Sequence, residues 1–218
     1  NIVSWLLKRG RDDADARSAA ATLASYLAAN PDGDARDLIK PLLPIMLTNF
    51  ASIAWPPFGN AIIRNKATAW RIEHALGDSF SFSNKKNAAI LHVPEDILFA
   101  WAYANPESAP AFLARVLPVL TAGEKGEARA FHPAMVRLLN EFGDRDDVRR
   151  CLGQNMHTFG WSGSLTTYFA LYEEPLRSLF EHPTGSLRRW ARETHGQMRK
   201  QVETARRDDD ERDAQWNA

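Results

Sequence analysis

The sequence predicts an all-α fold built from stacked helical hairpins, and three observations support this prediction. Apolar residues recur at helical spacing along most of the chain, as Leu23, Tyr26 and Leu27 do at i, i+3 and i+4. Short turns rich in Pro, Gly, Asn and Asp interrupt this spacing about ten or eleven times. The sequence has no alternation of strand and helix patterns that would indicate a parallel sheet.

The helices are predicted from this spacing and from the turns between them. We expect helices over residues 19–30, 35–49, 61–76, 94–105, 109–121, 133–142, 146–153, 165–180 and 187–207. The first ends where Asn30 precedes Pro31, because a residue before proline is pushed out of the α region. The run Trp55-Pro56-Pro57 is expected to stop a helix. Residues 78–87 are predicted to be a loop anchored by two phenylalanines, since no partner strand is found.

The composition is that of a folded globular chain with no dominant charge. Of its 218 residues, 44% are hydrophobic and 25% charged, and 27 basic residues balance 27 acidic ones. This composition excludes an intrinsically disordered chain, and zero net charge gives no global field favouring nucleic acid or an anionic membrane. One cysteine, Cys151, excludes a disulfide framework and a multi-cysteine zinc site.

The start of the chain and its most apolar stretch bear on location. The chain begins with Asn1, no signal-peptide pattern follows, and residues 1–7 resemble the end of a helix, so we expect part of a longer chain. The stretch 38–55 contains Lys40, two prolines and Asn49, and it is too polar to cross a membrane. A free cysteine without a targeting segment predicts a cytoplasmic protein that does not bind membranes.

Two parts of the chain resemble each other at an offset of about 75 residues. Residues 26–32 followed by 42–46 match residues 101–107 followed by 116–120. A period of this length is about twice that of a two-helix unit and is typical of stacked units. Two hairpins that share an Asn-Pro turn by chance are the alternative.

Three further segments open with a turn and continue with an apolar residue followed directly by arginine. They are Phe131 to Arg137, Gly143 to Arg149 and Glu181 to Ala191. These segments resemble HEAT-like repeats, with Leu187 where valine is usual. The resemblance covers residues 94–205 and more loosely 14–76, and residues 78–87 interrupt its register. It implies a right-handed α-α superhelix, HEAT- or armadillo-like, of roughly five helical hairpins.

The resemblance implies a single helical-repeat domain over residues 1–218. We expect sub-units over 1–77 and 88–207, joined by the loop 78–87, and an acidic tail over 208–218. The last third of the chain is also similar to the carboxyl-terminal helical-repeat region of large multidomain bacterial proteins, some of them in defence systems. That similarity transfers no catalytic residue.

Catalytic and metal-binding patterns are weak in this sequence. No His-Glu-x-x-His pattern and no glycine-rich phosphate loop occur. The segment Gly160 to Ser164 approaches a nucleophile elbow, but its last glycine is replaced and no strand pattern precedes it. An enzyme would need a pocket gathering His157, Ser162 or Glu173. We therefore expect no catalytic residue, no cofactor and no metal.

Aromatic residues in expected turns and arginines on helix faces are the candidates for a binding surface. These are Trp55, Trp161, Arg149, Arg150, Arg188, Arg189, Arg192 and Arg199. Either tryptophan could instead anchor a loop in the core. Residues 184–207 carry seven basic and two acidic residues, and residues 208–213 carry five acidic residues and one basic residue. This switch in sign suits a solvated helix that frays into an acidic tail.

The sequence therefore predicts a non-catalytic protein-recognition or scaffold module within a larger protein. Its partner would be another protein or another domain of the same chain, because a solenoid offers an extended surface. The alternative is a nucleic-acid-binding repeat domain that uses the basic faces at residues 149–150 and 188–207.

Overall fold

A computed structural model describes residues 13–30, 40–76, 88–122, 128–157 and 165–216. The elements in these ranges are α2 (Asp13–Ala29), α4 (Leu43–Arg64), α5 (Lys66–Leu76), η1 (Ala89–His92), α6 (Glu95–Ala104), α7 (Ala109–Val116), β1 (Leu120–Ala122), β2 (Ala128–Phe131), α8 (Pro133–Phe142), α9 (Asp146–His157), α10 (Leu165–Ser178) and α11 (Gly185–Trp216). Only the two short strands are not helical, so the predicted all-α class is confirmed. None of the helices in these ranges has both the length and the apolar composition needed to span a lipid bilayer.

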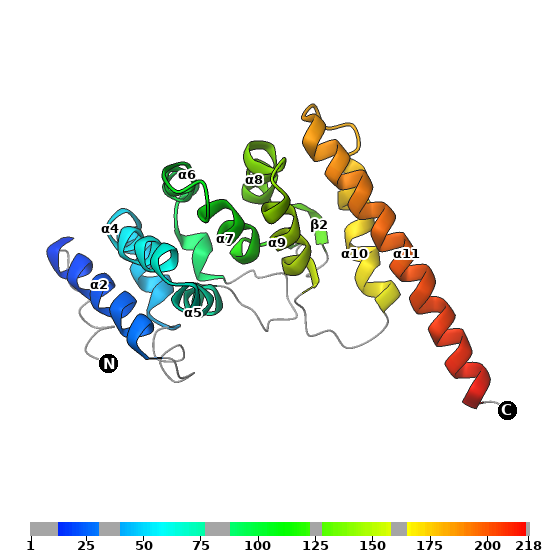
Figure 1. Ribbon diagram of the computed structural model, residues 1–218, viewed down its shortest axis with the longest axis horizontal. Coiled ribbons are helices and arrows are strands. Elements are labelled where there is room, and N and C mark those ends of the chain that lie inside the picture. Colours follow the sequence, from blue (N-terminus) through cyan, green and yellow to red (C-terminus); the bar gives the residue numbers. More distant parts are fainter. Residues whose placement is uncertain (1–12, 31–39, 77–87, 123–127, 158–164, 217–218) are drawn as a thin grey trace.

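The helices follow one another in chain order along the long axis of the molecule (Figure 1). α4, α6 and α8 lie in one layer, and α5, α7 and α9 lie in a second. α4 packs against α6, and α7 packs against both α5 and α9. The helices that pack closely against one another are near neighbours in chain order, as α7 and α9 or α10 and α11 are. Each part of the array is therefore held by the helices next to it.

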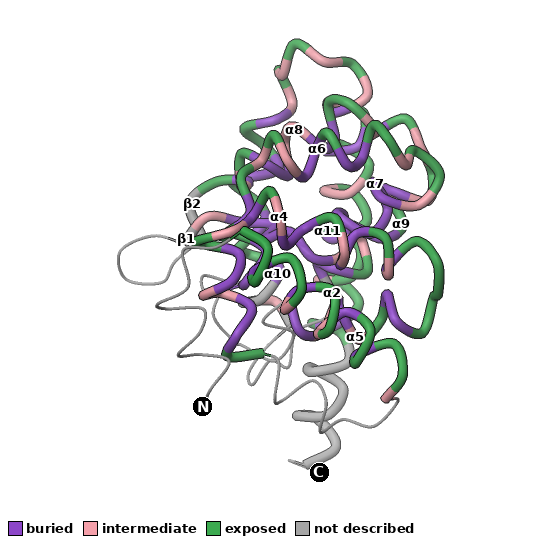
Figure 2. Tube along the Cα trace, turned by 90° about the vertical axis from the view of Figure 1, so that its left-hand side faces the viewer, coloured by how far each residue is buried: buried purple, intermediate pink, exposed green. Residues whose placement is uncertain are grey.

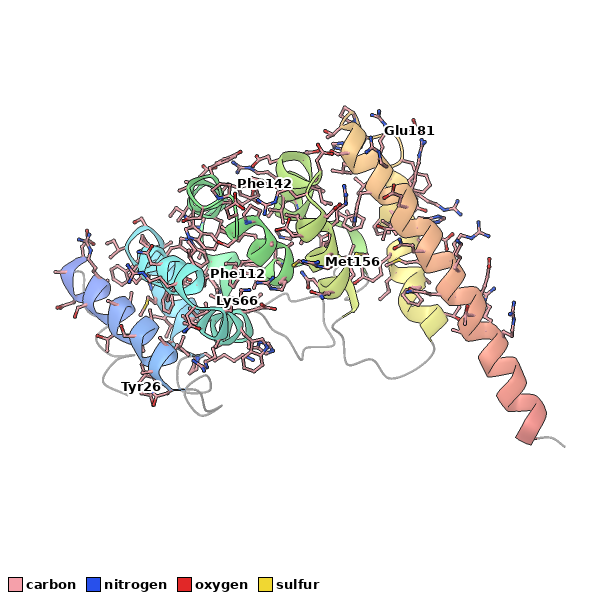
Figure 3. All side chains as sticks on the ribbon, viewed as in Figure 1. Tyr26, Lys66, Phe112, Phe142, Met156 and Glu181 are labelled. Carbon is pink, nitrogen blue, oxygen red and sulfur yellow. The ribbon has the colours of Figure 1, made fainter. Side chains whose placement is uncertain are left out.

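One continuous apolar core runs through the array, from Ala20 in α2 to Met198 in α11. Figure 2 shows the buried residues along the middle of the molecule and the exposed ones around it. Every residue of α7 is buried except Arg115, which is partly exposed. In Figure 3, Phe112 of α7 lies inside the array, whereas Tyr26 lies at one edge. α7 therefore has no continuous solvent-facing side.

Three asparagines end helical segments in the same way. The side-chain amides of Asn30, Asn49 and Asn105 each donate to the backbone carbonyl oxygen four residues earlier, at 2.9, 2.8 and 3.0 Å. These amides add a donor where a helical segment ends. The Tyr26 carbonyl oxygen also accepts from the backbone N–H of Asn30, at 3.0 Å. Asn49 directly precedes Phe50, whose φ of −139° and ψ of 33° interrupt α4. The interruption therefore falls at the predicted end of the helix 35–49.

The structure matches the sequence repeat in its first part only. Asn30 and Asn105 end α2 and α6 with the same side-chain hydrogen bond. Pro44, however, lies in the first turn of α4, whereas Pro118 follows the end of α7. The two segments therefore share a helix end but not the element that comes next.

The expected helix stop at Trp55-Pro56-Pro57 is wrong, because this run lies inside α4. A proline inside a helix removes one backbone donor, and packing can outweigh that loss. Here Trp55 and Phe58 are both buried and hold the segment in the core.

The helix expected to reach Thr121 ends at Val116 instead. Leu117 precedes Pro118 and has the extended conformation, φ −66° and ψ 142°, that a residue before proline favours. β1 and β2 follow as an antiparallel hairpin with Leu120 opposite Phe131, which the sequence analysis did not predict.

α11 forms an antiparallel hairpin with α10 at the carboxyl-terminal end of the array, and it also packs against α8 (Figure 1). It has 32 residues and continues to Trp216, so the expected fraying into a tail after residue 207 is wrong. Its inner stripe is buried at Leu187, Trp190, Ala191 and Met198. The opposite side is exposed and polar.

Arg115 joins three consecutive helices of the second layer. Its Nε donates to Glu73 of α5 at 2.7 Å, and a second guanidinium nitrogen donates to Sγ of Cys151 in α9 at 3.2 Å. Burial alone would lower the pKa of Arg115, but the hydrogen bond and the charge of Glu73 raise it above its ordinary value. Arg115 therefore stays charged between the helices.

Asn155 of α9 is the second polar link to α7, and only 2% of the residue is exposed. Its side-chain amide donates at 2.8 Å to the carbonyl oxygens of both Ala114 and Leu117. These carbonyls lie at the carboxyl-terminal end of α7, where intrahelical donors run out.

A third link ties the turn before α9 to the turn before α7. The guanidinium of Arg145 donates to the carbonyl oxygens of Pro106 and Glu107 and pairs with Asp147 at 2.7 Å. The hydrogen bond from Arg145 lowers the pKa of the Asp147 carboxyl below its ordinary value. Neighbouring helical pairs are therefore joined by polar contacts as well as by the core.

Candidate binding surface

A groove between α9 and α11 contains the predicted arginines Arg149 and Arg150, but none of the described basic residues of α11. The groove has a volume of about 290 Å³. It is lined by Arg149, Arg150, Gly153 and Met156 of α9 and by Trp190, Glu193, Thr194, Gln197, Met198 and Gln201 of α11. Residues 149–150 and the helix 188–207 thus contribute to one surface, although they lie far apart in the chain.

The groove has an apolar floor and polar walls. Met156, Trp190 and Met198 are buried at 1%, 5% and 5% exposure and form the floor. On the α11 wall, Gln197 and Gln201 are exposed and four residues apart, so they project from the same side of the helix. The walls can therefore form hydrogen bonds while the floor packs against an apolar group.

The two arginines of the α9 wall are in different states. Arg149 is half-buried, donates to the Gly143 carbonyl oxygen at 3.0 Å and pairs with Asp146. Arg150 is exposed and has no hydrogen-bond or ion-pair partner among the described residues. Arg150 is therefore the guanidinium that a ligand in the groove could engage without breaking an existing contact.

Gly153 lies in the middle of α9 and lines this groove. A Cβ atom placed on Gly153 would meet no other atom within 4 Å, so packing does not require glycine here. Glycine inside a helix is less favourable than alanine by roughly 0.5–1 kcal/mol. Because Gly153 has no side chain, the α9 wall of the groove is not filled at this position.

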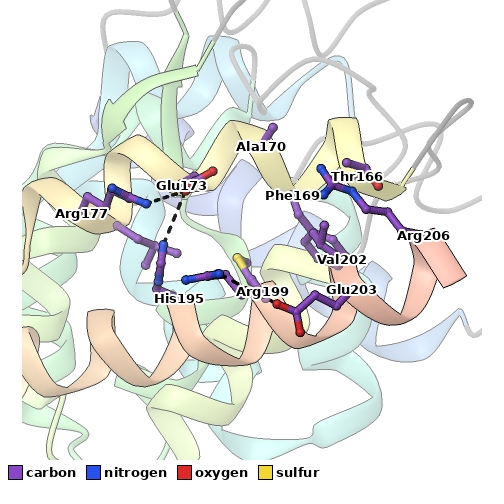
Figure 4. A pocket seen from close by; sticks show the side chains of 12 residues that line it. Thr166, Phe169, Ala170, Glu173, Arg177, His195, Arg199, Val202, Glu203 and Arg206 are labelled. Carbon is purple, nitrogen blue, oxygen red and sulfur yellow. Dashed lines mark hydrogen bonds and ion pairs between the residues drawn. The ribbon is translucent and has the colours of Figure 1, made fainter.

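A second pocket, of about 330 Å³, lies between α10 and α11 (Figure 4). Glu173 is central to it, with its carboxylate 2.9 Å from Arg177 and 3.9 Å from Nε2 of His195. On α11, Arg199 lies 3.9 Å from Glu203. The charges of this pocket are therefore largely paired with one another. The side chain of His195 is 13% exposed, and its Nε2 is buried with no hydrogen-bond partner among the described residues.

The other candidate arginines lie outside the groove. Arg188 donates to the carbonyl oxygens of His182 and Pro183, at 2.6 and 2.8 Å. Arg192 likewise donates to the Phe180 carbonyl oxygen at 3.0 Å. These two arginines hold the turn between α10 and α11 together, which is a structural role.

Arg189 lies on the outward side of α11 and is exposed without a partner among the residues that the structure describes. Lys200 and Arg207 follow 11 and 18 residues later, also exposed and without side-chain partners in the same ranges. At about 100° per residue these three positions fall on one stripe of the helix. Arg189, Lys200 and Arg207 are called the outward basic stripe below.

The prediction that Trp55 contributes to a binding surface is wrong. Trp55 is 1% exposed, and its ring meets that of Trp101 edge to face at 5.3 Å. It therefore anchors α4 in the core, the other role that the sequence left open. Trp161, the other tryptophan candidate, lies outside the described residues.

An enzyme would need His157, Ser162 or Glu173 in one pocket, and the structure describes only some of these side chains. Ser162 lies outside the described ranges, and nothing is described for the side chain of His157, the last residue of α9. Glu173 lies in the second pocket. Within the described part of the chain, no group of three or more His, Cys, Asp or Glu side chains is placed to hold a metal ion.

Two histidines that precede prolines share one role. Nδ1 of His132 accepts from the backbone N–H of Ala134 at 3.3 Å, and Nδ1 of His182 accepts from that of Thr184 at 3.2 Å. Burial lowers the pKa of His132, and the negative charge of Glu95 opposes this only partly. His132 therefore caps α8 in its neutral form.

Sequence reasoning missed the uncharged members of the groove. Thr194, Gln197 and Gln201 recur at spacings of three and four residues beside the apolar stripe of α11. That polar stripe is a usable signal in the sequence, although charge alone points to the arginines. The apposition of α9 to α11 depends on the course of the chain between residues 157 and 185, which no local pattern gives.

Comparisons of the chain with family models, with curated proteins and with solved structures found no match.

Proposed function

We propose that this chain is a non-catalytic recognition module, a HEAT-like solenoid of roughly five helical hairpins that binds another protein. In this proposal the array is one part of a larger cytoplasmic bacterial protein, and its partner is another chain or another domain. The observation that carries the proposal is the groove between α9 and α11, at the end of an array whose helices stack in chain order. Solenoids of this kind use extended surfaces for binding.

The two sides of α11 support this proposal. A terminal unit of a repeat array needs a polar outer face, and the outward side of α11 carries Arg189, Lys200 and Arg207, all exposed. Because this side of α11 is polar, it can face solvent without a further repeat packed against it. The groove beside it is then open to a partner.

The experiment that tests this function is a pull-down with the whole chain as bait, with and without nuclease, at about 0.1 M and about 0.5 M salt. We expect a protein that stays bound after nuclease treatment and at the higher salt concentration. Absence of any such protein, with nucleic acid recovered only at low salt, would contradict the proposal.

The outward basic stripe favours nucleic acid as a second candidate partner. Arg189, Lys200 and Arg207 lie along one side of a helix, and none of them has a side-chain partner in the part of the chain that the structure describes. Three phosphate contacts would give a slope of about −3 in log affinity against log salt for duplex DNA. Titration of a labelled duplex of about 20 base pairs tests this, and Lys200→Glu should make the slope shallower by about 1 or more. A slope near zero would remove this candidate.

A further inference from the structure

We infer that the groove between α9 and α11 binds a short extended peptide segment that carries carboxylate side chains. This inference rests on the proposed function, because it names the chemical class of the protein segment that is recognised. Four features of the groove carry it: its length, the spacing of its glutamines, its unpaired arginine and the burial of the Trp190 ring.

The length of the groove and the glutamine spacing fit an extended chain. From Trp190 to Gln201 the wall covers eleven helical rises, or about 17 Å, which is the length of about five extended residues. Gln197 and Gln201 are separated by about 6 Å along the helix, close to the roughly 6.6 Å between alternate residues of a strand. Each side-chain amide has donors and an acceptor, so the two can pair with backbone groups of alternate peptide residues.

Arg150 gives the groove one place where a carboxylate can bind, because Arg149 is already paired with Asp146. Arg149 and Arg150 line one wall, and Glu193 is the only acidic residue among the described lining residues. Arg150 has no partner within the described ranges, so it can form a charge-assisted hydrogen bond with an incoming carboxylate. Glu193 would repel a second carboxylate placed beside it. The acidic residue of the segment is therefore expected opposite α9.

The floor of the groove favours a peptide over a single-stranded nucleic acid. Single strands are held by aromatic rings on which bases stack. Trp190 is 5% exposed, and its ring meets that of Phe131 edge to face at 5.5 Å, so it offers no free stacking face. Met156 and Met198 instead give an adaptable apolar floor that suits an aliphatic side chain.

Gly153 gives a direct way to close the groove without disturbing the core. A side chain at this position would grow into open space along the α9 wall, so Gly153→Leu should fill the groove and leave the helix folded. Gly196 is a matched control, because it also lies within a helix, also has open space around its Cβ position and does not line the groove. Gly196→Leu should therefore leave the groove unchanged.

The test selects a phage-displayed library of random seven-residue peptides on the whole chain and measures the enriched peptides by fluorescence anisotropy. We expect enriched sequences with Asp or Glu at one fixed position. Their affinity should fall at least about ten-fold in Gly153→Leu and about ten-fold in Arg150→Ala, and change less than about two-fold in Gly196→Leu. Circular dichroism on each variant establishes that it is folded.

Four results would overturn the inference. The first is a library that yields no enriched peptide, or peptides without acidic residues. The second is equal binding of the enriched peptides by the wild type and Gly153→Leu. The third is a labelled oligothymidylate that binds the wild type and is lost in Gly153→Leu, which would assign the groove to nucleic acid. The fourth is a protein that the wild type and Gly153→Leu capture equally, which would contradict the groove inference but agree with the proposed function.

Discussion

The link between α9 and α7 through Asn155 gives a prediction whose magnitude follows from the structure. Asn155→Ala removes two 2.8 Å hydrogen bonds and leaves the carbonyl oxygens of Ala114 and Leu117 buried without this donor. Each buried hydrogen bond contributes roughly 1 kcal/mol, and each unsatisfied carbonyl adds to the loss. We therefore expect the free energy of unfolding to fall by about 2–4 kcal/mol.

A second substitution separates the hydrogen bonds from the volume of the side chain. Asn155→Asp has nearly the same shape, but its carboxylate cannot donate and would face two carbonyl oxygens. It should destabilise at least as much as Asn155→Ala. Asn49→Ala is the matched control, because Asn49 also donates from its side-chain amide to a backbone carbonyl, at 2.8 Å, but it is exposed. Its loss should be about 1 kcal/mol or less.

The assay is urea unfolding of the whole chain, followed by far-ultraviolet circular dichroism. The reasoning would be refuted if Asn155→Ala lost no more stability than Asn49→Ala. It would also be refuted if Asn155→Asp were as stable as the wild type, because the geometry of the two donated bonds would then not matter.

Three further predictions concern helix ends and glycines. Arg145→Lys keeps the charge but loses the forked donor, so the free energy of unfolding should fall by about 1 kcal/mol in urea; an unchanged midpoint would contradict this. Because the folded state lowers the pKa of His132, stability should be full above its ordinary pKa of 6.5 and fall as the pH drops below it. His132→Asn keeps an acceptor for the cap and should flatten this dependence between about pH 5 and 8, and equal slopes for both proteins would count against it. Gly196→Ala should raise the free energy of unfolding by about 0.5–1 kcal/mol, and a loss would show that the site is not open.

The helical class could be predicted because its signals are local. Asn30 and Asn105 each precede a proline, which predicts a helix end, and their side chains do end α2 and α6. Where packing outweighs a local rule, prediction failed, as in the run Trp55-Pro56-Pro57, which the core holds inside α4. The hairpin after α7 was missed because β1 has only three residues and its strand pattern is too short to stand out.

The candidate site was predicted only in its charged part. Arg149 and Arg150 could be singled out by their charge, but sequence alone does not tell that one is already paired and the other free. Gln197 and Gln201 gain their meaning only when α9 lies beside them. That apposition is a long-range contact, and long-range contacts leave no periodic trace in the sequence.

The burial of α7 determines how this array can open. A helix with a solvent-facing side can exchange its amide hydrogens when it frays or unwinds alone. α7 has no such side, so its amides become accessible only when α5 and α9 separate from it, which breaks the contacts of Arg115 and Asn155 together. The slowest-exchanging amides of the molecule should therefore lie in its middle, and their exchange rate measures how often the two halves of the array part.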